Sequence, residues 1–201
     1  MCTKEKLVEY YSWLRKYGYN DSHSGNASFR DQNTIWVTPS GACADTLQAK
    51  DLVACSMEGL TGENASFDAR LHVEVYKQNP SARALLHSHG PHSIAVTMNG
   101  KDFAPEDFEG KLYFPKVPVL NIPFAEYSEK SPDLIARILR EHCITVTRGH
   151  GVYACGKSLD LAYKWTCSLE HSAKISCLGR QINSNNHVSS TISKSSFTAP
   201  H

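Results

Sequence analysis

The spacing of apolar residues along the chain predicts a mixture of helices and strands. Between Thr3 and Lys16 the apolar positions fall at i, i+3, i+4 and i+7, which places them on one face of a helix. Short apolar runs that suit strands alternate with further helical stretches and with turn residues. We expect strands at about 27–30, 34–38, 52–56, 84–87, 117–122 and 143–147, helices at about 68–78, 92–98 and 158–178, and one more helix after the cap Ser131-Pro132-Asp133.

The C-terminal segment follows a different pattern. Residues 183–201 are rich in Ser, Asn and Thr and poor in apolar residues. Burial of their side chains therefore cannot offset the entropy cost of ordering them. Because 201 residues are the size of one domain, we expect a single folded domain over 1–182 and a flexible tail over 183–201.

Charge and composition exclude several classes of partner. Lys plus Arg number 21 and Asp plus Glu 20, so no strong positive field attracts a nucleic acid or an anionic membrane. The sequence contains no apolar stretch of transmembrane length and no signal-peptide core. The seven cysteines are scattered without a C-x-x-C pair, which is typical of reduced thiols. These features predict a cytoplasmic protein with neither a membrane nor a nucleic-acid partner.

Candidate chemistry begins with His87-Ser88-His89 at the end of an apolar run. Side chains two residues apart on a strand point to the same face, so both imidazoles can reach one metal ion. A catalytic zinc site typically has three protein ligands and one open position. His150, between Gly149 and Gly151 and after the apolar run 143–147, supplies a third imidazole.

Other interpretations of these residues stay open. An isolated H-x-H pair is often a surface or core pair, and a Gly-His-Gly segment is usually a plain turn. A cysteine-dependent hydrolase that uses Cys143 or Cys155 is a further hypothesis, and it needs a thiol of low pKa beside a histidine.

Five motifs in order resemble the class II aldolase and adducin family, which includes fuculose-phosphate aldolase and the adducin head domain. They are Ser24-Gly25-Asn26-Ala27-Ser28, Thr38-Pro39-Ser40-Gly41, Asp68 four positions before His72, His87-Ser88-His89, and Gly149-His150-Gly151-Val152. The resemblance covers about residues 4–182. It implies an α/β fold with three layers, in which helices flank a central and mostly antiparallel β-sheet, and a homotetramer with active sites between neighbouring subunits.

The resemblance also implies roles for particular residues. His87, His89 and His150 match the three metal-binding histidines, with Zn²⁺ as the first expectation and Mn²⁺, Co²⁺ or Ni²⁺ as others. Asp68 matches an acid/base residue that can also touch the metal. The residues that match the substrate-phosphate loops are Gly25, Asn26, Ser40, Gly41 and Ser66, and their N–H groups and hydroxyls suit an oxyanion.

Three departures from the family pattern change this picture. Asp68 replaces a Glu, which shortens the side chain by one methylene. Phe67 replaces a phosphate-contacting Ser, so the phosphate site is weakened or the substrate carries no phosphate. Fuculose-phosphate aldolase uses a C-terminal tyrosine in catalysis, but no tyrosine follows Ile182 in this sequence. Another acid must therefore protonate the product. The candidates from the acidic segment 105–113 are Glu106, Glu109 and Tyr113, although a solvated turn before a strand is the simpler interpretation of each.

The expected function is that of a metal-dependent lyase that acts on a small-molecule sugar phosphate or hydroxy-ketone. It would perform retro-aldol cleavage of a ketose phosphate or related hydroxy-ketone through a metal-stabilised enediolate. A decarboxylase or a 4-epimerase of a sugar phosphate or keto acid would use the same intermediate. A non-catalytic, adducin-like scaffold is the alternative from a different class, and retention of all three histidines disfavours it.

Overall fold

The protein is built around one seven-stranded sheet in the computed structural model, which describes residues 2–59 and 62–194. The strands lie in the order β3-β2-β1-β4-β7-β6-β5, and every neighbouring pair is antiparallel except β5 and β6. Their bounds are β1 Asn26–Asp31, β2 Thr34–Val37, β3 Val53–Ser56, β4 Ala84–Ser88, β5 Val119–Leu120, β6 Ile144–Thr147 and β7 Gly151–Gly156. The expected mostly antiparallel sheet is confirmed.

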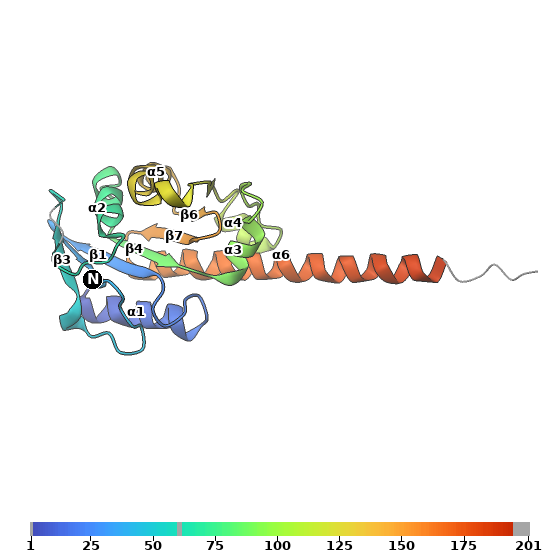
Figure 1. Cartoon of the computed structure of the whole chain (residues 1–201), viewed down its shortest axis with the longest axis horizontal. Coiled ribbons are helices and arrows are strands. Elements are labelled where there is room, and N and C mark those ends of the chain that lie inside the picture. The colour runs from blue at the N-terminus through green and yellow to red at the C-terminus, as the bar shows by residue number, and fades with distance from the viewer. Residues whose placement is uncertain (1, 60–61, 195–201) are drawn as a thin grey trace, which may run out of the picture.

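Helices cover both faces of this sheet (Figure 1). α2 and α5 pack together on one face, and α1 and α6 lie on the other, where α6 also packs against α3 and α4. The helices are α1 Lys4–Lys16, α2 Ala69–Gln78, α3 Pro91–Thr97, α4 Phe108–Tyr113, α5 Tyr127–Glu141 and α6 Leu159–Lys194, with short 3-10 turns η1 Ala49–Asp51 and η2 Phe124–Glu126. The three-layer α/β architecture is therefore as expected.

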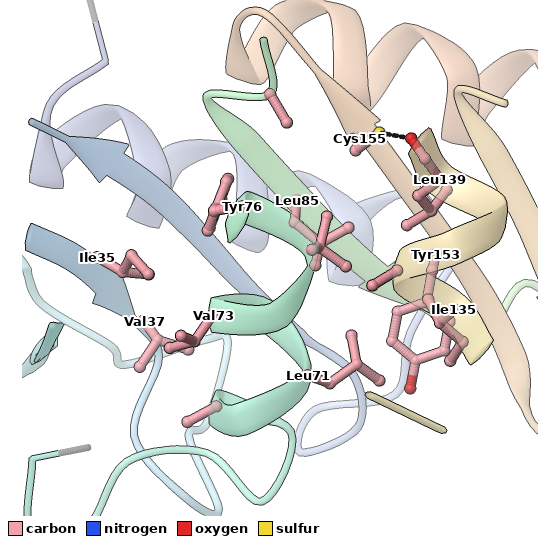
Figure 2. Close-up of a cluster of buried hydrophobic side chains, with 14 of the residues drawn as sticks. Ile35, Val37, Leu71, Val73, Tyr76, Leu85, Ile135, Leu139, Tyr153 and Cys155 are labelled. Atoms are coloured by element: carbon pink, nitrogen blue, oxygen red, sulfur yellow. Dashed lines mark hydrogen bonds between the residues drawn. The ribbon is translucent and has the colours of Figure 1, made fainter. Parts of the chain in front are cut away.

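Separate apolar cores on the two sides of the sheet hold the layers together. Figure 2 shows the core beneath α2 and α5, where Leu71 and Ile135 lie near Leu85 and Tyr153 of the sheet. On the other side, Leu7 and Leu14 of α1 pack with residues of β1, β4 and α6. Strand β4 is buried at all five positions, so its C-terminal end is a rigid place from which to present a side chain.

Several elements differ from the expectations. Strand β7 was not expected, because the segment Gly149-His150-Gly151 suggested a turn, yet all its residues but Gly156 are buried. α5 begins at Tyr127, not at Ser131, with Pro132 inside the helix. The 3-10 turn η2 runs directly into α5, so the helix starts before the proline. β5 covers only two residues of the expected strand 117–122.

Two helices also correct the sequence-based picture. The acidic turn expected near Glu109 contains α4, because the Asp107 carboxylate accepts the Gly110 N–H and caps a helix there. α6 continues to Lys194 instead of ending near Leu178, so residues 183–194 of the expected tail are helical. No proline interrupts this segment, and a helix can extend its backbone hydrogen bonds without burying side chains. Residues 195–201 lie outside the described part of the chain.

Across the described residues, no helix combines the length and the apolar character needed to cross a membrane.

Candidate active site

The three predicted histidines converge at one edge of the sheet. His87 is in β4, His89 lies just beyond that strand, and His150 lies in the turn before β7. One ligand nitrogen from each lies within 4.8 Å of the other two. The ring centroids are 4.6 Å apart for His87 and His89, 4.8 Å for His87 and His150, and 5.1 Å for His89 and His150. The structure thus brings together residues that are 63 positions apart in the chain (150 − 87).

Strand register and one glycine explain why the histidines can meet. His87 pairs directly with Tyr153 of β7, and their rings stack with centroids 4.0 Å apart. A Cβ atom at Gly151 would lie 2.5 Å from the Ser88 carbonyl oxygen and 2.8 Å from ring carbons of His87 and of His89. Only a glycine therefore lets β7 pass this close to the histidine pair.

The histidines present nitrogen lone pairs to one another. His87 Nδ1 lies 3.0 Å from the Val152 carbonyl oxygen, so it carries the proton and donates, and Nε2 is left as a lone pair. That Nε2 lies 2.9 Å from Nε2 of His89. Burial lowers the pKa of all three imidazoles, to about 4 for His89. Neutral rings are the form that binds a metal ion.

His150 adds an unsatisfied group to this cluster. Its Nδ1 is buried and has no hydrogen-bond partner among the described residues. A buried polar atom without a partner costs free energy unless a ligand satisfies it. Three converging imidazoles with lone pairs to spare are the donor set of a catalytic zinc-type centre. The residues present therefore fit a divalent metal ion.

Asp68 lies beside the histidines with a carboxylate that is almost fully buried. Its Oδ2 lies 3.9 Å from His87 Nε2 and accepts hydrogen bonds from Asn26 Nδ2 at 3.0 Å and Tyr153 OH at 2.8 Å. Burial alone would raise the pKa of Asp68, but hydrogen bonds from Asn26 and Tyr153 stabilise the carboxylate, and the net pKa lies below the ordinary value. The carboxylate is therefore ionised and held in one orientation.

Two tyrosines that sequence reasoning missed complete this group. Tyr153 is fully buried, and its hydroxyl bonds to Asp68. Tyr127 OH donates to Asp68 Oδ1 at 3.4 Å and also contacts the Tyr153 hydroxyl, and its ring lies edge-on to His150 at 4.7 Å. Burial raises the pKa of both phenols, so both stay protonated. The alternation of β7 could have indicated Tyr153, since it lies two residues after Gly151; nothing in the sequence singled out Tyr127.

A cavity of about 620 Å³ opens over these residues. Of the predicted site residues, those that line it are Gly25, Asn26, Asp68, His87, His89 and His150. Phe67 and Phe124 also line it, with 72% and 99% of their side chains exposed. No sequence signal pointed to Phe124 or Tyr127, because the connection from η2 to α5 on which both lie contains no motif.

The other predicted phosphate residues, Ser40, Gly41 and Ser66, do not line this cavity. Ser40 and Ser66 are in neighbouring segments joined by the Pro39–Ala65 bridge, and Gly41 follows Ser40 in the left-handed conformation with φ of 67°. The Ser66 hydroxyl accepts the Asp68 N–H at 3.3 Å. Ser66 therefore also fixes the start of the segment that carries Asp68.

The family of this chain follows from comparison with known proteins. The model of the Class II Aldolase and Adducin N-terminal domain matches residues 5–177. This chain belongs to the class II aldolase and adducin family. The expected family is thus confirmed over nearly the whole described domain.

Individual class II aldolase relatives agree with this assignment. The 3-oxo-tetronate 4-phosphate decarboxylase of Haemophilus influenzae is 32% identical over 186 residues, with 87% of each chain covered. The L-fuculose phosphate aldolase of Methanocaldococcus jannaschii is 25% identical over 179 residues, which cover 87% of this chain and 96% of that protein. The crystal structure of L-fuculose-1-phosphate aldolase from Thermus thermophilus matches with a TM-score of 0.81 and 32% identity, covering 87% of this chain and 93% of that one.

These relatives confirm the expected enzyme class, a lyase of the class II aldolase type. Class II aldolases use a divalent metal, which agrees with the histidine cluster of this chain.

The three residues predicted as proton donors lie apart from the histidine cluster. Glu109 and Tyr113 line a different hollow between α4 and α6, together with His171. Glu106 is exposed just before α4. None of the three lines the cavity over the histidines. Within one chain they are therefore not placed to transfer a proton there.

The cysteine hypothesis fails on the character of the thiols. Burial raises the pKa of Cys155 to about 12 and also raises the pKa of Cys143. Neither residue lines the cavity that holds the histidines. A nucleophilic thiol needs the opposite shift.

Proposed function

We propose that this class II aldolase cleaves a carbon–carbon bond in a ketose phosphate or a related hydroxy-ketone, with a divalent ion bound by His87, His89 and His150. The observation that carries the proposal is the convergence of three neutral imidazoles in one cavity. Zn²⁺ is the first candidate because it favours three imidazole ligands with an open fourth position, and Mn²⁺, Co²⁺ or Ni²⁺ are the others.

A bound divalent ion supplies Lewis-acid stabilisation of the negative charge that develops on substrate oxygens. The chain's own residues supply position and protons. The ionised Asp68 carboxylate, 3.9 Å from His87 Nε2, can accept the proton of a substrate hydroxyl. Its hydrogen bonds from Asn26 and Tyr153 hold it for that task.

Tyr127 is our candidate for the proton donor that the sequence left unassigned. Its phenol faces the cavity, carries its proton and is joined to Asp68. A proton given by Tyr127 to the product carbon can be replaced from Asp68 through this hydrogen bond. Acid and base then form one connected pair.

Phosphate recognition is assigned to the loops at the β1 and β2 end of the cavity. Gly25 and Asn26 line it directly. The hydroxyls of Ser40 and Ser66 and the Gly41 N–H are the further donors, because the Ser66 hydroxyl accepts from Asp68 and can still donate its own proton. Phe67 on the same rim narrows the space left for the phosphate.

Assembly as a homotetramer in the cytoplasm belongs to the same proposal. Seven unpaired cysteines agree with a reducing compartment. Exposed apolar side chains at Phe108 and Leu112 of α4 agree with coverage by a neighbour. In such an assembly Glu106, Glu109 and Tyr113 would act, if at all, in the cavity of an adjacent subunit.

Decarboxylation of a sugar-acid phosphate is the second candidate function. It is favoured by the 32% identity with the 3-oxo-tetronate 4-phosphate decarboxylase. A 4-epimerase would need the same residues, and a scaffold would need none of them.

A substrate panel tests the proposal. Purified protein supplemented in turn with Zn²⁺, Mn²⁺, Co²⁺ and Ni²⁺ is assayed with ketose phosphates, the unphosphorylated ketoses and keto-acid phosphates, and bound metal is measured by mass spectrometry. We expect one metal per chain and cleavage of a phosphorylated substrate, both lost in His89→Ala and kept in His142→Ala, an exposed histidine outside the cavity. Absence of stoichiometric metal in the wild type would favour the scaffold.

A further inference from the structure

The cavity extends along the sheet edge on both sides of the histidines. β1 begins, β4 ends, β7 begins and β6 ends at this edge, as the pairs Asn26–His87 and Thr147–Gly151 show. From β1 to β6 there are three strand spacings, or roughly 14 Å. The proposed phosphate loops lie at the β1 end, so a substrate that reaches the histidines has room to continue toward β6.

Arg148 lies at that far end, directly after β6. Among the described residues that line the cavity it is the one Lys or Arg. Its Nε donates to the Met98 carbonyl oxygen at 2.7 Å, which fixes the plane of the guanidinium. No carboxylate in the described part of the chain forms an ion pair with it. The terminal N–H groups of the guanidinium are thus left without an acidic partner beside the cavity.

The preceding residue provides a second, independent observation. Thr147 lines the same cavity and is 98% buried (2% exposed), yet its Oγ1 has no hydrogen-bond partner among the described residues. A buried hydroxyl without a partner is costly and rare. A buried hydroxyl of this kind and a guanidinium without an acidic partner, both lining one cavity, are the pattern of an oxyanion site that its ligand completes.

We infer that Arg148, assisted by the Thr147 hydroxyl, binds a carboxylate at the end of the substrate opposite the phosphate. This inference rests on the proposed function and narrows it to substrates that are both sugar phosphates and sugar acids. A carboxylate matches the planar guanidinium with two parallel hydrogen bonds. Arg148 is a specificity residue: it holds the same group before and during the reaction, so it affects binding more than the rate of bond cleavage.

Binding measurements on metal-free protein test this assignment without any turnover. The probes, titrated by calorimetry after removal of metal with a chelator, are 3-phosphoglycerate with both groups, glycerol 3-phosphate with the phosphate alone, and glycerate with the carboxylate alone. Without metal, no preference can come from chelation. We expect the wild type to bind 3-phosphoglycerate about 10- to 100-fold more tightly than glycerol 3-phosphate, the range of a charge-assisted hydrogen-bonded pair.

The variants separate recognition from structure. Arg148→Gln should abolish the preference for 3-phosphoglycerate, Arg148→Lys should keep part of it, and Thr147→Val should reduce it severalfold. Arg137→Gln, which removes an exposed arginine of α5 outside the cavity, should keep it in full. Thermal unfolding of each variant checks that the fold is intact.

Three outcomes of the binding measurements would overturn the inference. If Arg148→Gln keeps the preference, Arg148 only holds the end of α3 through Met98. If Arg148→Gln weakens the binding of glycerol 3-phosphate as much as the binding of 3-phosphoglycerate, Arg148 binds the phosphate instead. Absence of a preference in the wild type also contradicts a carboxylate site. If the substrate panel fails while these probes behave as expected, the proposed reaction is wrong and the anion site remains.

Discussion

At the scale of single residues, Gly151 controls how closely β7 approaches the histidine pair. We expect Gly151→Ala to lose most bound metal and roughly 100-fold or more in activity, because the added Cβ would overlap the Ser88 carbonyl and both rings. Metal analysis and kinetics measure this. Gly179→Ala is the matched control: beyond the local backbone of α6, no atom lies within 4 Å of its added Cβ, and alanine stabilises a helix by up to about 1 kcal/mol. Full metal binding by Gly151→Ala would contradict the role given to this glycine.

His72 gives a residue-scale prediction about pH. It is fully buried, its two ring nitrogens bond to Ser28 Oγ and Asn26 Oδ1, and burial lowers its pKa from 6.5 to about 4. Because the unfolded chain takes up a proton first, the stability from neutral His72 is present above pH 6.5 and is lost as the pH falls toward 4.

Urea unfolding of metal-free protein measures this contribution. Between about pH 7.5 and about pH 5, His72→Gln should lose about 2 kcal/mol less unfolding free energy than the wild type. His142→Gln, at an exposed position, should lose as much as the wild type. Equal losses for His72→Gln and the wild type would mean that His72 is already protonated in the fold.

The residues that could be predicted are those with a local pattern. His87 and His89 stand two apart on an apolar run, and His150 stands between glycines, so strand geometry and family motifs together identified the three. Tyr127 could not be found this way, because it meets Asp68 only when α5 packs over β7. His72 is fully buried, and both of its ring nitrogens find hydrogen-bond partners from β1.

At the scale of elements, α3 is fixed by a carboxylate from α6. Glu170 is 5% exposed and accepts hydrogen bonds from the N–H groups of His92 and Ser93, the Ser93 hydroxyl and the His92 ring. A helix N-terminus favours a negative charge. Since α3 begins two residues after His89, this contact also helps to position the segment that carries the proposed metal ligand His89.

Glu170→Gln tests this coupling between helices. We expect it to lower the unfolding free energy by about 2–3 kcal/mol and metal affinity by roughly 10-fold, because one amide cannot replace a carboxylate that serves four donors. Denaturant unfolding and chelator competition measure the two effects. His171→Gln changes the next, exposed residue of α6 and should leave both unchanged. Loss of stability with normal metal affinity would limit Glu170 to a structural role.

Elements with clear periodicity were predicted within a few residues, and those set by packing were not. α1 and β4 agree with their apolar spacing. β7 lies between glycines that locally suggest turns, and it forms a strand because it pairs with β4 on one side and β6 on the other. α6 extends past the body of the domain (Figure 1), where burial no longer indicates its end.

At the scale of the whole molecule, the proposed metal site joins strands that are distant in the chain. β4 and the turn before β7 supply the ligands, and these two strands are central in the sheet. An ion that binds the folded chain and not the unfolded one raises the free energy of global unfolding. The site therefore predicts that metal stabilises the entire domain and not one loop.

Thermal unfolding with and without metal measures this effect. At a free Zn²⁺ concentration about a thousandfold above Kd, the gain is about 4 kcal/mol, which corresponds to roughly 10 °C in Tm for a domain of this size. The seven free cysteines can also bind Zn²⁺ when the chain unfolds, and this would lower the gain. His150→Ala keeps every cysteine, so it should show little or no rise in Tm, whereas His142→Ala should show the full rise. An equal rise in His150→Ala would place the stabilising ion away from the three histidines and remove the basis of the metal centre.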